Sequence, residues 1–374
     1  MSKPMTYKGA GVDYTALDRF KRAAQKSAAV TDHFFPDYRI KVCAWSRGES
    51  AFLVQLPDGS ILAHVEEGLG TKQLVADAML KLQPDGPTYY GALARDTVAM
   101  IVNDMITVGV LPVTLAMHLA VGSDDWFANE QRSQDLIDGW EMSCCFTGCI
   151  WGGGETPTLR DTINPMTCVL AGSATGYLDA SAVDRLISGQ TLKSGQAIVM
   201  LASSGVHANG LTLCRKIAKR LPKGYLTPVG MDKLAYGELL LKPTTIYVPI
   251  LRDLMRSGVK IHSAINVTGH GWRKLMRAPQ ALRYVIDKLP PEPSPIFGFI
   301  QKNGPVDIGE MYGNFNMGAG FAIIVDETNV RTVIEAADHH HVQAWHAGFV
   351  KDGSKQVFIR PLNLTFEADT LAVR

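Results

Sequence analysis

The residues best suited to chemistry in this sequence are acidic side chains close to glycine-rich turns. Asp104 follows Asn103 in residues 96–108, a segment whose apolar residues recur at helical spacing. A carboxylate in so apolar a segment must be solvated, paired or bound to a cation, because burying it alone is very costly. Taken alone, Asp104 is better explained as a helix cap or a surface residue. Two glycine loops on either side of it favour a binding site instead.

The first of these loops, residues 66–72, reads Glu-Glu-Gly-Leu-Gly-Thr-Lys. Gly68 and Gly70 let backbone N–H groups approach an anion, and Lys72 supplies a compact positive charge that suits phosphate. Glu67 is a candidate Mg²⁺ ligand, since proteins usually hold this ion with one or two carboxylates and the substrate's phosphates. The Walker spacing is absent, and a short glycine loop alone is more often only a turn.

The second loop contains three consecutive glycines, among them Gly153 and Gly154, and ends at Glu155. We expect a short strand at residues 149–151 and an abrupt exit from it through the glycines. Such a run suits a backbone pressed against a ligand, with Glu155 reaching into the same site.

Further glycine turns occur elsewhere in the chain. Residues 203–210 connect an expected strand to an expected helix, which makes an anion site at the helix N-terminus plausible. Residues 266–271 repeat the glycine-turn theme. Near the start, Lys8 lies in a loop, residues 7–13, that can fold over a phosphate, although a frayed terminus explains it equally well.

Hydrophobic periodicity and turn residues predict alternating strands and helices in both halves, and hence α/β or α+β layers. The expected helices are residues 17–30, 96–108, 129–148, 211–220 and a segment ending at 257. The expected strands are residues 51–56, 61–65, 110–119, 149–151, 167–177, 197–202 and 321–325. Residues 179–195 are polar and rich in turns, so we predict two domains, residues 1–178 and 179–374.

Composition narrows the class of protein. A chain of 374 residues suggests two domains, and its 46% apolar and 20% charged residues are typical of a globular protein. The net charge of +1 offers no electrostatic argument for nucleic acid or an anionic membrane. The most apolar run, residues 105–121, is interrupted and too short to span a bilayer comfortably. With no secretory signal and no disulfide-like cysteine pattern, we expect a cytoplasmic protein with reduced thiols.

A run of three histidines, His339 to His341, lies between an expected helix and an expected strand. It has the composition of a metal site. Adjacent residues cannot all face one ion, so a solvated loop is the preferred interpretation.

The motifs together resemble the phosphoribosylformylglycinamidine cyclo-ligase family, also called aminoimidazole ribonucleotide synthetases. Its superfamily includes selenophosphate synthetase and thiamine-monophosphate kinase. Order and spacing both hold nearly from end to end. The matching segments are residues 7–13, 68–72, 98–112, 148–156, 203–216, 242–247, 267–271 and 310–320.

The resemblance implies a two-domain α+β or α/β fold, with an N-terminal mixed sheet that pairs across a homodimer and C-terminal α/β layers. It also implies de novo purine biosynthesis. ATP activates the formyl amide oxygen of formylglycinamidine ribonucleotide as an iminophosphate, and the amidine nitrogen then closes the imidazole ring. An amide oxygen leaves poorly until phosphorylated, so the site must place the terminal phosphate against it and hold Mg²⁺. Neither nucleic acid nor membrane is an expected partner.

The family's motifs imply roles for particular residues. The implied metal ligands are Glu67, Asp104 and Glu155. The implied catalytic residues are Asp104, Glu155 and Lys72. The implied nucleotide-binding residues are Lys8, Glu67, Gly68, Gly70, Thr71, Lys72 and Asn103. The implied substrate-binding residues are Gly153, Gly154, Ser204, His207, Asn209, Gly210, Thr268 and Gly269.

The sequence departs from the family pattern within the motifs. Glu67 stands where the family has aspartate, Val169 where it has an acid, and Asn266 where it has histidine, while His270 replaces a glycine. We expect Glu67 to compensate by reaching the metal from a slightly retracted loop; alternatively, Val169 packs in a strand core and was never part of the site. Two other functions stay open: a paralogue that phosphorylates another small substrate, and a catalytically silent homologue.

Overall fold

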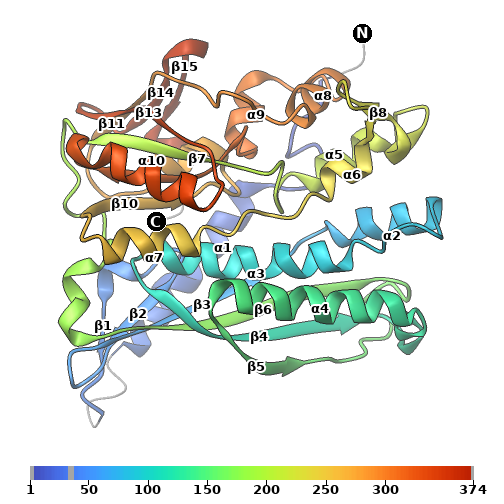
Figure 1. Ribbon diagram of the computed structural model, residues 1–374, viewed down its shortest axis with the longest axis horizontal. Helices are drawn as coiled ribbons and strands as arrows, with labels where there is room; N and C mark the ends of the chain where they lie inside the picture. Colours follow the sequence, from blue (N-terminus) through green and yellow to red (C-terminus); the bar gives the residue numbers. More distant parts are fainter. Residues whose placement is uncertain (1–3, 33–37, 372–374) are drawn as a thin grey trace.

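The computed structural model describes residues 4–32 and 38–371, which form two sheets with helices packed on them (Figure 1). The first sheet has six strands in the order β1-β2-β3-β6-β4-β5, and only its β4–β5 pair is parallel. Its strands are β1 (Lys41–Val42), β2 (Phe52–Gln55), β3 (Ile61–Gly68), β4 (Leu111–Val121), β5 (Ile150–Glu155) and β6 (Cys168–Leu178).

The second sheet has seven strands in the order β10-β12-β7-β13-β11-β14-β15, and the predicted domain boundary at residue 179 lies between the two sheets. Its strands are β7 (Ala197–Ala202), β10 (Ile261–Asn266), β11 (Leu282–Ile286), β12 (Ala319–Val325), β13 (Ala344–Asp352), β14 (Gln356–Ile359) and β15 (Leu364–Glu367). A two-stranded ribbon consists of β8 (Pro228–Val229) and β9 (Leu234–Ala235). Strand β12 is buried throughout and forms part of the core.

The helices fill the space around and between the sheets. They are α1 (Tyr14–Ala28), α2 (Gln73–Leu82), α3 (Tyr90–Ile106), α4 (Glu130–Thr147), α5 (Leu211–Ala218), α6 (Tyr236–Leu240), α7 (Val248–Arg256), α8 (Ile296–Asn303), α9 (Ile308–Asn314) and α10 (Val330–His339). Across the described residues, no helix combines the length and the apolar character needed to cross a bilayer.

The first sheet is covered unequally on its two faces. Helices α3 and α4 lie along one face (Figure 1). Because side chains alternate along a strand, the residues of β3 that are not buried against these helices point to the other face. That face exposes large apolar side chains: Leu62, Val113, Ile150, Val169 and Tyr177. An exposed apolar sheet face of this kind is a candidate interface.

Strand β5 continues through the glycine run to Glu155, so the expectation that the strand ends at residue 151 is wrong. Gly154 lies directly against β4. A Cβ atom at this position would meet the carbonyl oxygen of Met117 at 2.0 Å, so glycine is what allows the two strands to pair. The close backbone approach that we expected toward a ligand is, for Gly154, an approach to the neighbouring strand.

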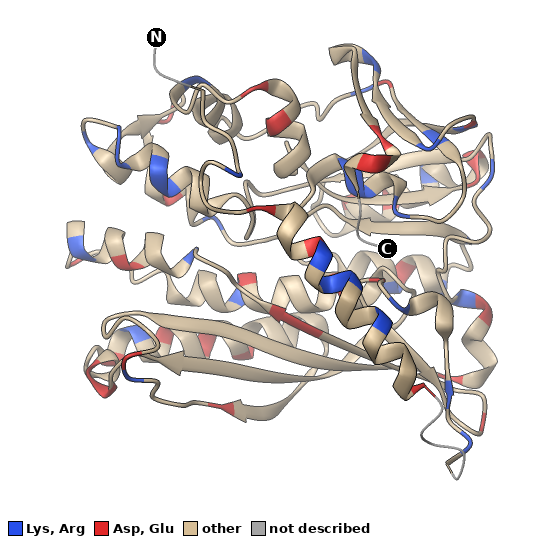
Figure 2. Ribbon diagram, turned by 180° about the vertical axis from the view of Figure 1, so that it is seen from behind, with Lys and Arg blue, Asp and Glu red and all other residues tan. Residues whose placement is uncertain are grey.

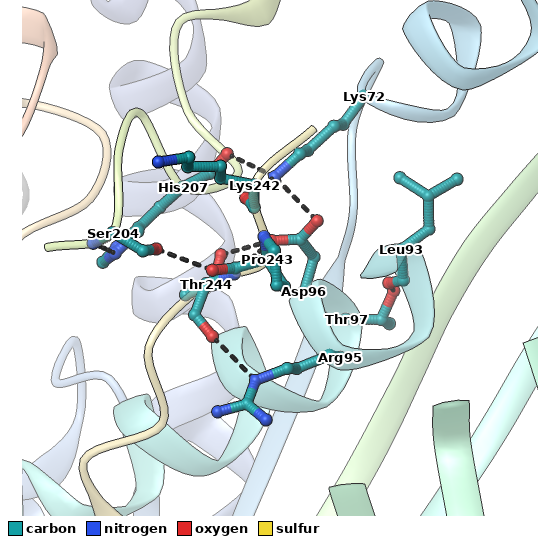
Figure 3. A network of polar contacts seen from close by, with 10 residues as sticks. All are labelled: Lys72, Leu93, Arg95, Asp96, Thr97, Ser204, His207, Lys242, Pro243 and Thr244. Carbon is teal, nitrogen blue, oxygen red and sulfur yellow. Dashed lines mark hydrogen bonds and ion pairs between the residues drawn. The ribbon is translucent and has the colours of Figure 1, made fainter. Parts of the chain in front are cut away.

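A buried ion pair within the first half of the chain lies at its junction with the second half (Figure 3). Lys72 Nζ lies 2.7 Å from Asp96 Oδ2, and both side chains are 0% exposed. The same ammonium donates hydrogen bonds to the carbonyl oxygens of His207, at 3.0 Å, and Lys242, at 2.9 Å. Asp96 in turn accepts a hydrogen bond from the backbone N–H of Thr244, at 2.8 Å. One charge pair of the first half thereby holds backbone groups of the second.

A second polar residue of α3, about two turns after Asp96, adds to this attachment. The side chain of Asn103 donates to the carbonyl oxygen of Thr245 and accepts from the N–H of Tyr247, both at 2.9 Å. Asp104 therefore belongs to a helix whose orientation toward the second half is set by polar contacts with residues 244, 245 and 247.

The N-terminal residues also bridge the two halves. Figure 2 shows α1 crossing the junction diagonally, with Lys and Arg positions along it. Before it, the N–H of Tyr7 donates to the carboxylate of Glu310 at 3.1 Å, and the ammonium of Lys216 donates to the carbonyl oxygen of Gly9 at 2.8 Å. This loop is consequently an ordered wall, not a frayed end.

We expect Lys72→Met to lower the free energy of unfolding by about 3–5 kcal/mol, because it leaves the Asp96 carboxylate buried without its counter-charge. Urea unfolding followed by circular dichroism measures the change. Lys81→Met, at an exposed position near the end of the same helix, is the matched control and should shift the unfolding free energy by less than about 0.5 kcal/mol. Equal stability of the two variants would contradict this role for the ion pair.

Candidate active site

A cavity of about 310 Å³ opens where the end of β3, the last turn of α3 and the start of α5 meet. The sequence predicted several of its walls. The predicted site residues that line it are Glu67, Gly68, Gly70, Thr71, Asp104, Asn209, Gly210 and Thr268. Residues from the two sheets and from the N-terminal loop, which adds Tyr7 and Val12, thus face one space.

A second cavity, of about 460 Å³, shares a wall with the first. Both are lined by Glu67 and Asp104, so the carboxylates stand where the two spaces meet. The second cavity is also lined by Gly269 and by three cationic residues, Lys21, Lys274 and Arg277. The same lining includes four carboxylates, those of Glu49, Glu66, Glu67 and Asp104, so a negatively charged group would fit only on the cationic side of this cavity.

The carboxyl group of Glu67 is perturbed by its surroundings. Burial and the nearby charge of Asp104 raise the pKa of Glu67 to about 7, although Lys274 and Lys21 act against this shift. Burial also lowers the pKa of Lys274 to about 8, with Asp104 opposing the change. Asn266 donates from Nδ2 to Asp104 Oδ1 at 2.8 Å and so orients that carboxylate. Two neighbouring carboxylates are stabilised either when one of them is protonated or when a cation binds between them.

Regular elements hold these charged groups in place. Glu67 is next to the last residue of β3 and pairs with Gly172 of β6. Asn266 ends β10, and a 3₁₀ helix, η7 (Gly271–Met276), follows a few residues later. Lys274 and Arg277 are three residues apart along this turn, which is the spacing that puts two side chains on one side of a helix.

Two backbone turns face the first cavity. Gly70 has φ +77°, and Gly210, which precedes α5, has φ +80°; both lie in the left-handed region that favours glycine. A side chain at Gly210 would also overlap the ring of Phe315, 2.0 Å away. Next to these turns, Thr71 Oγ1 and Thr212 Oγ1 lie 3.4 Å apart. The free N–H groups at the start of α5 and the neighbouring hydroxyls make this end suitable for phosphate.

An aromatic stack closes the second cavity on the side of α1. The ring centroids of Tyr7 and Tyr14 are 5.5 Å apart, and those of Tyr14 and His270 are 3.9 Å apart. His270 Nε2 lies 3.1 Å from the carboxylate of Asp18 in α1. Burial lowers the pKa of His270 to about 4, so this imidazole is neutral near pH 7. His270 therefore forms part of the wall of the second cavity and attaches α1 to it.

Four of the predicted site residues hold the domain junction and line neither cavity. All three N–H groups of the Lys72 ammonium have protein partners, which leaves none for a phosphate. Asn103 is equally engaged with residues 245 and 247. The ring of His207 accepts from the N–H of Ser204 at 3.2 Å, while burial and Lys72 lower its pKa to about 3. The hydroxyl of Ser204 donates to the carbonyl oxygen of Pro243 at 2.6 Å.

Lys8 and Glu155 are also apart from the cavities. Lys8 is 76% exposed and pairs with Asp13 at 3.0 Å. Glu155 is exposed on β5, and β6 and β4 lie between β5 and β3, the strand of Glu67. Three strand spacings correspond to about 14 Å. Within one chain, therefore, neither Glu155 nor Gly153 joins Asp104.

The expectation that Val169 packs in a strand core is wrong, because its side chain is 44% exposed on the uncovered face of the first sheet. The predictions also missed Lys21 and the pair Lys274 and Arg277. The spacing of that pair, just after a glycine turn, was the signal that was available. No local sequence pattern indicates that Lys21 lines the second cavity, because this depends on where α1 crosses the junction.

Comparison with known proteins agrees with these features. Residues 48–178 match the family of AIR synthase related proteins through its N-terminal domain, and residues 193–360 match its C-terminal domain. A phosphoribosylformylglycinamidine cyclo-ligase of Methanocaldococcus jannaschii is 35% identical, with 93% of each chain covered. The enzyme of that name from Carboxydothermus hydrogenoformans is 32% identical, over 95% of this chain and 98% of its own.

Solved structures show the same fold at low sequence identity. The HypE-HypF complex matches with a TM-score of 0.60 and 15% identity, over 92% of this chain and 99% of that chain. AaThiL complexed with AMPPCP and TMP matches with a TM-score of 0.55 and 13% identity, over 83% and 87%. T. maritima PurL complexed with ADP matches with a TM-score of 0.52 and 14% identity, over 85% of this chain and 46% of that chain.

The two-domain α/β fold, the paired family domains and the full-length relatives at 32–35% identity lead to one conclusion. The chain belongs to the phosphoribosylformylglycinamidine cyclo-ligase family of AIR synthase related proteins.

Proposed function

We propose that the protein closes the imidazole ring of aminoimidazole ribonucleotide from formylglycinamidine ribonucleotide, at the expense of ATP, in purine biosynthesis. The observation that carries the proposal is the meeting of Glu67 and Asp104 at the wall shared by two cavities. One cavity is flanked by backbone turns suited to phosphate and the other by cations. The full-length relatives that carry the name of this enzyme supply the reaction.

The donor set at the shared wall fits Mg²⁺. This ion prefers oxygen ligands, and the two carboxylates supply them beside a place for nucleotide phosphates. Bound there, Mg²⁺ would neutralise charge on the phosphates as the terminal one is transferred. Asn266 holds Asp104 in one orientation, at 2.8 Å, and Glu67 approaches from the facing strand. We assign Glu67 and Asp104 as the metal ligands contributed by this chain.

The two cavities suit the two substrates. The first places the N–H groups at the start of α5 and the turn at Gly70 around the nucleotide phosphates. The second would then take formylglycinamidine ribonucleotide, whose ribose phosphate would lie toward Lys21 and Lys274. Arg277 adds positive charge there while its guanidinium holds Glu49, at 2.9 Å. This arrangement directs the formyl amide oxygen toward the carboxylates, where the phosphoryl group arrives.

A catalytically silent homologue is the competing possibility, and the position of Val169 bears on it. This residue lies on the exposed sheet face and lines neither cavity of its own chain. Replacing an acid there leaves the Glu67 and Asp104 pair intact. A buried carboxylate whose pKa is raised by burial and by a neighbouring carboxylate is typical of a functional site.

A homodimer would give Glu155 a role that one chain cannot provide. The uncovered face of the first sheet exposes apolar side chains, and β5 is an edge strand, which is a surface that soluble proteins usually cover. Symmetric pairing through this face is the commonest solution. In such a dimer, we assign Glu155 and Gly153 to the cavity of the partner subunit.

The proposed activity is tested with purified protein, formylglycinamidine ribonucleotide, ATP and Mg²⁺, by measuring aminoimidazole ribonucleotide. We expect turnover, and we expect Asp104→Asn to reduce kcat/KM at least about tenfold, since a charged ligand is worth about 1–3 kcal/mol. Asp138→Asn, on the exposed side of α4, should leave the kinetics unchanged. ATP hydrolysis or phosphoryl transfer to another compound, without ring closure, would favour the paralogue, and inactivity would favour the silent homologue.

The raised pKa of Glu67 predicts a stability cost that depends on pH. Its pKa is about 7 in the fold and 4.5 normally, so the folded protein binds more protons in between and loses stability as the pH rises through this range. Glu67→Gln removes this loss. Thermal melts without metal should therefore show the variant more stable than wild type at pH 8, and less so at pH 5. Glu66→Gln, an exposed neighbour, is the control; a wild type as stable as Glu67→Gln at pH 8 would contradict the prediction.

Subunit complementation tests the role of Glu155 across the dimer. Asp104→Asn and Glu155→Gln homodimers should each be nearly inactive. When the two variants are co-expressed, each heterodimer regains one intact site, so about half of its sites should work. Heterodimers of Asp104→Asn with Glu67→Gln serve as the control, because both changes affect residues of the same chain's cavity. No recovery in the first pair, or a monomer in sedimentation at micromolar concentration, would reject the shared site.

A further inference from the structure

The histidine run occupies the end of α10, beside α7. The two helices are in contact, and α10 packs on the central strands β7 and β13 of the second sheet (Figure 1). His339 is the last residue of α10, and His340 follows it as the cap with φ −100° and ψ 17°. The chain therefore leaves the helix between the two residues.

This change of backbone direction lets neighbouring imidazoles face one point. His340 Nε2 lies 2.7 Å from Asp253 Oδ2 of α7, and His339 Nδ1 lies 3.6 Å from the same oxygen. The potential ligand atoms of all three residues lie within 4.8 Å of one another. Two of the three histidines meet the geometric condition that the whole run cannot meet. His341 is outside this cluster.

The chemistry of the three groups selects a class of ion. Two imidazole nitrogens and one carboxylate oxygen are typical ligands of Zn²⁺ and of Co²⁺ or Ni²⁺, whereas Mg²⁺ prefers oxygen alone. The C-terminal end of α10 adds partial negative charge from its last carbonyl groups, which favours a cation. Three protein ligands leave a tetrahedral ion one position for water, and His339, with 77% of its side chain exposed, keeps the place open to solvent.

One cation already competes for the carboxylate. Arg256 Nη1 lies 4.0 Å from Asp253 Oδ1, but its side chain is 74% exposed. An ion pair at this distance and exposure contributes little free energy, so the guanidinium can move away at small cost. The hydrogen bond between His340 and Asp253 must also lengthen slightly for an ion to enter, and a rotation of the carboxylate achieves this.

We propose that Asp253, His339 and His340 form a binding site for one divalent transition-metal ion of the Zn²⁺ class, which ties α10 to α7. None of the three residues lines the cavities assigned to substrates. The ion is accordingly a structural link within the second half of the chain. Because it binds only where both helices are in place, it stabilises the folded state by mass action.

The test uses tag-free protein freed of metal with a chelator and titrated with Zn²⁺ by calorimetry. We expect about one equivalent to bind, and His340→Ala to weaken this binding at least about tenfold, as even loss of a residue that only supports a ligand does. His341→Ala is the matched control from the same run and should bind as wild type. Co²⁺ should give the visible absorption of a low-coordinate site in wild type and His341→Ala, but not in His340→Ala.

A second measurement separates a defined site from general attraction to histidines. Zn²⁺ should raise the melting temperature of wild type and of His341→Ala, and this shift should be lost in His340→Ala and in His339→Ala, whose exposed side chain can be removed without disturbing the fold. Turnover should be unchanged in all three variants. The proposal is overturned if wild type binds no Zn²⁺, if His340→Ala binds it as tightly as wild type, or if His341→Ala weakens binding equally.

Discussion

The buried pair of Lys72 and Asp96 is the contact on which the arrangement of the two sheets depends. A lysine ammonium without exposure is stable only if every N–H has a partner, and here one partner comes from the first half and two from the second. The pair thereby fixes residues 207 and 242 against α2 and α3. Helix α3 and the segments next to residues 72 and 207 line the first cavity, so the shape of the cavity depends on an interaction that is outside it.

The cavity itself shows the opposite electrostatic condition. At the junction Lys72 and Asp96 neutralise each other, whereas burial and the nearby charge of Asp104 raise the pKa of Glu67 to about 7. Lys274 and Arg277 lie near but are also held by backbone and by Glu49. The buried charges at the junction are thus paired, whereas two carboxylates lie next to each other at the cavities. Unfavourable electrostatic energy of this kind is concentrated where ligands bind.

Much of this could be predicted from the sequence, for physical reasons that differ between residues. The glycine turns and the periodic segments are local signals, so β4, the turn before α5 and the end of α3 are predicted close to their observed positions, although α3 begins at Tyr90, six residues before the predicted start. Lys72 was misjudged because a glycine-Thr-Lys sequence looks the same whether its lysine faces a phosphate or a buried aspartate 24 positions away. For Glu155, strand order and not sequence spacing decides which carboxylates of one chain meet, and two strands separate β5 from β3.

The N-terminal loop, residues 7–13, bears on access to the two cavities. It lines the cavities and is attached mainly by the hydrogen bonds from Tyr7 and to Gly9, whereas the helix that follows is anchored by the buried contact of Asp18 with His270. Segments held by so few contacts open far more often than a core unfolds. A local opening of this loop would therefore uncover the cavities while α1 and the Lys72 junction stay in place. The stable junction between the two sheets and the locally opening loop are thus separate parts of the molecule.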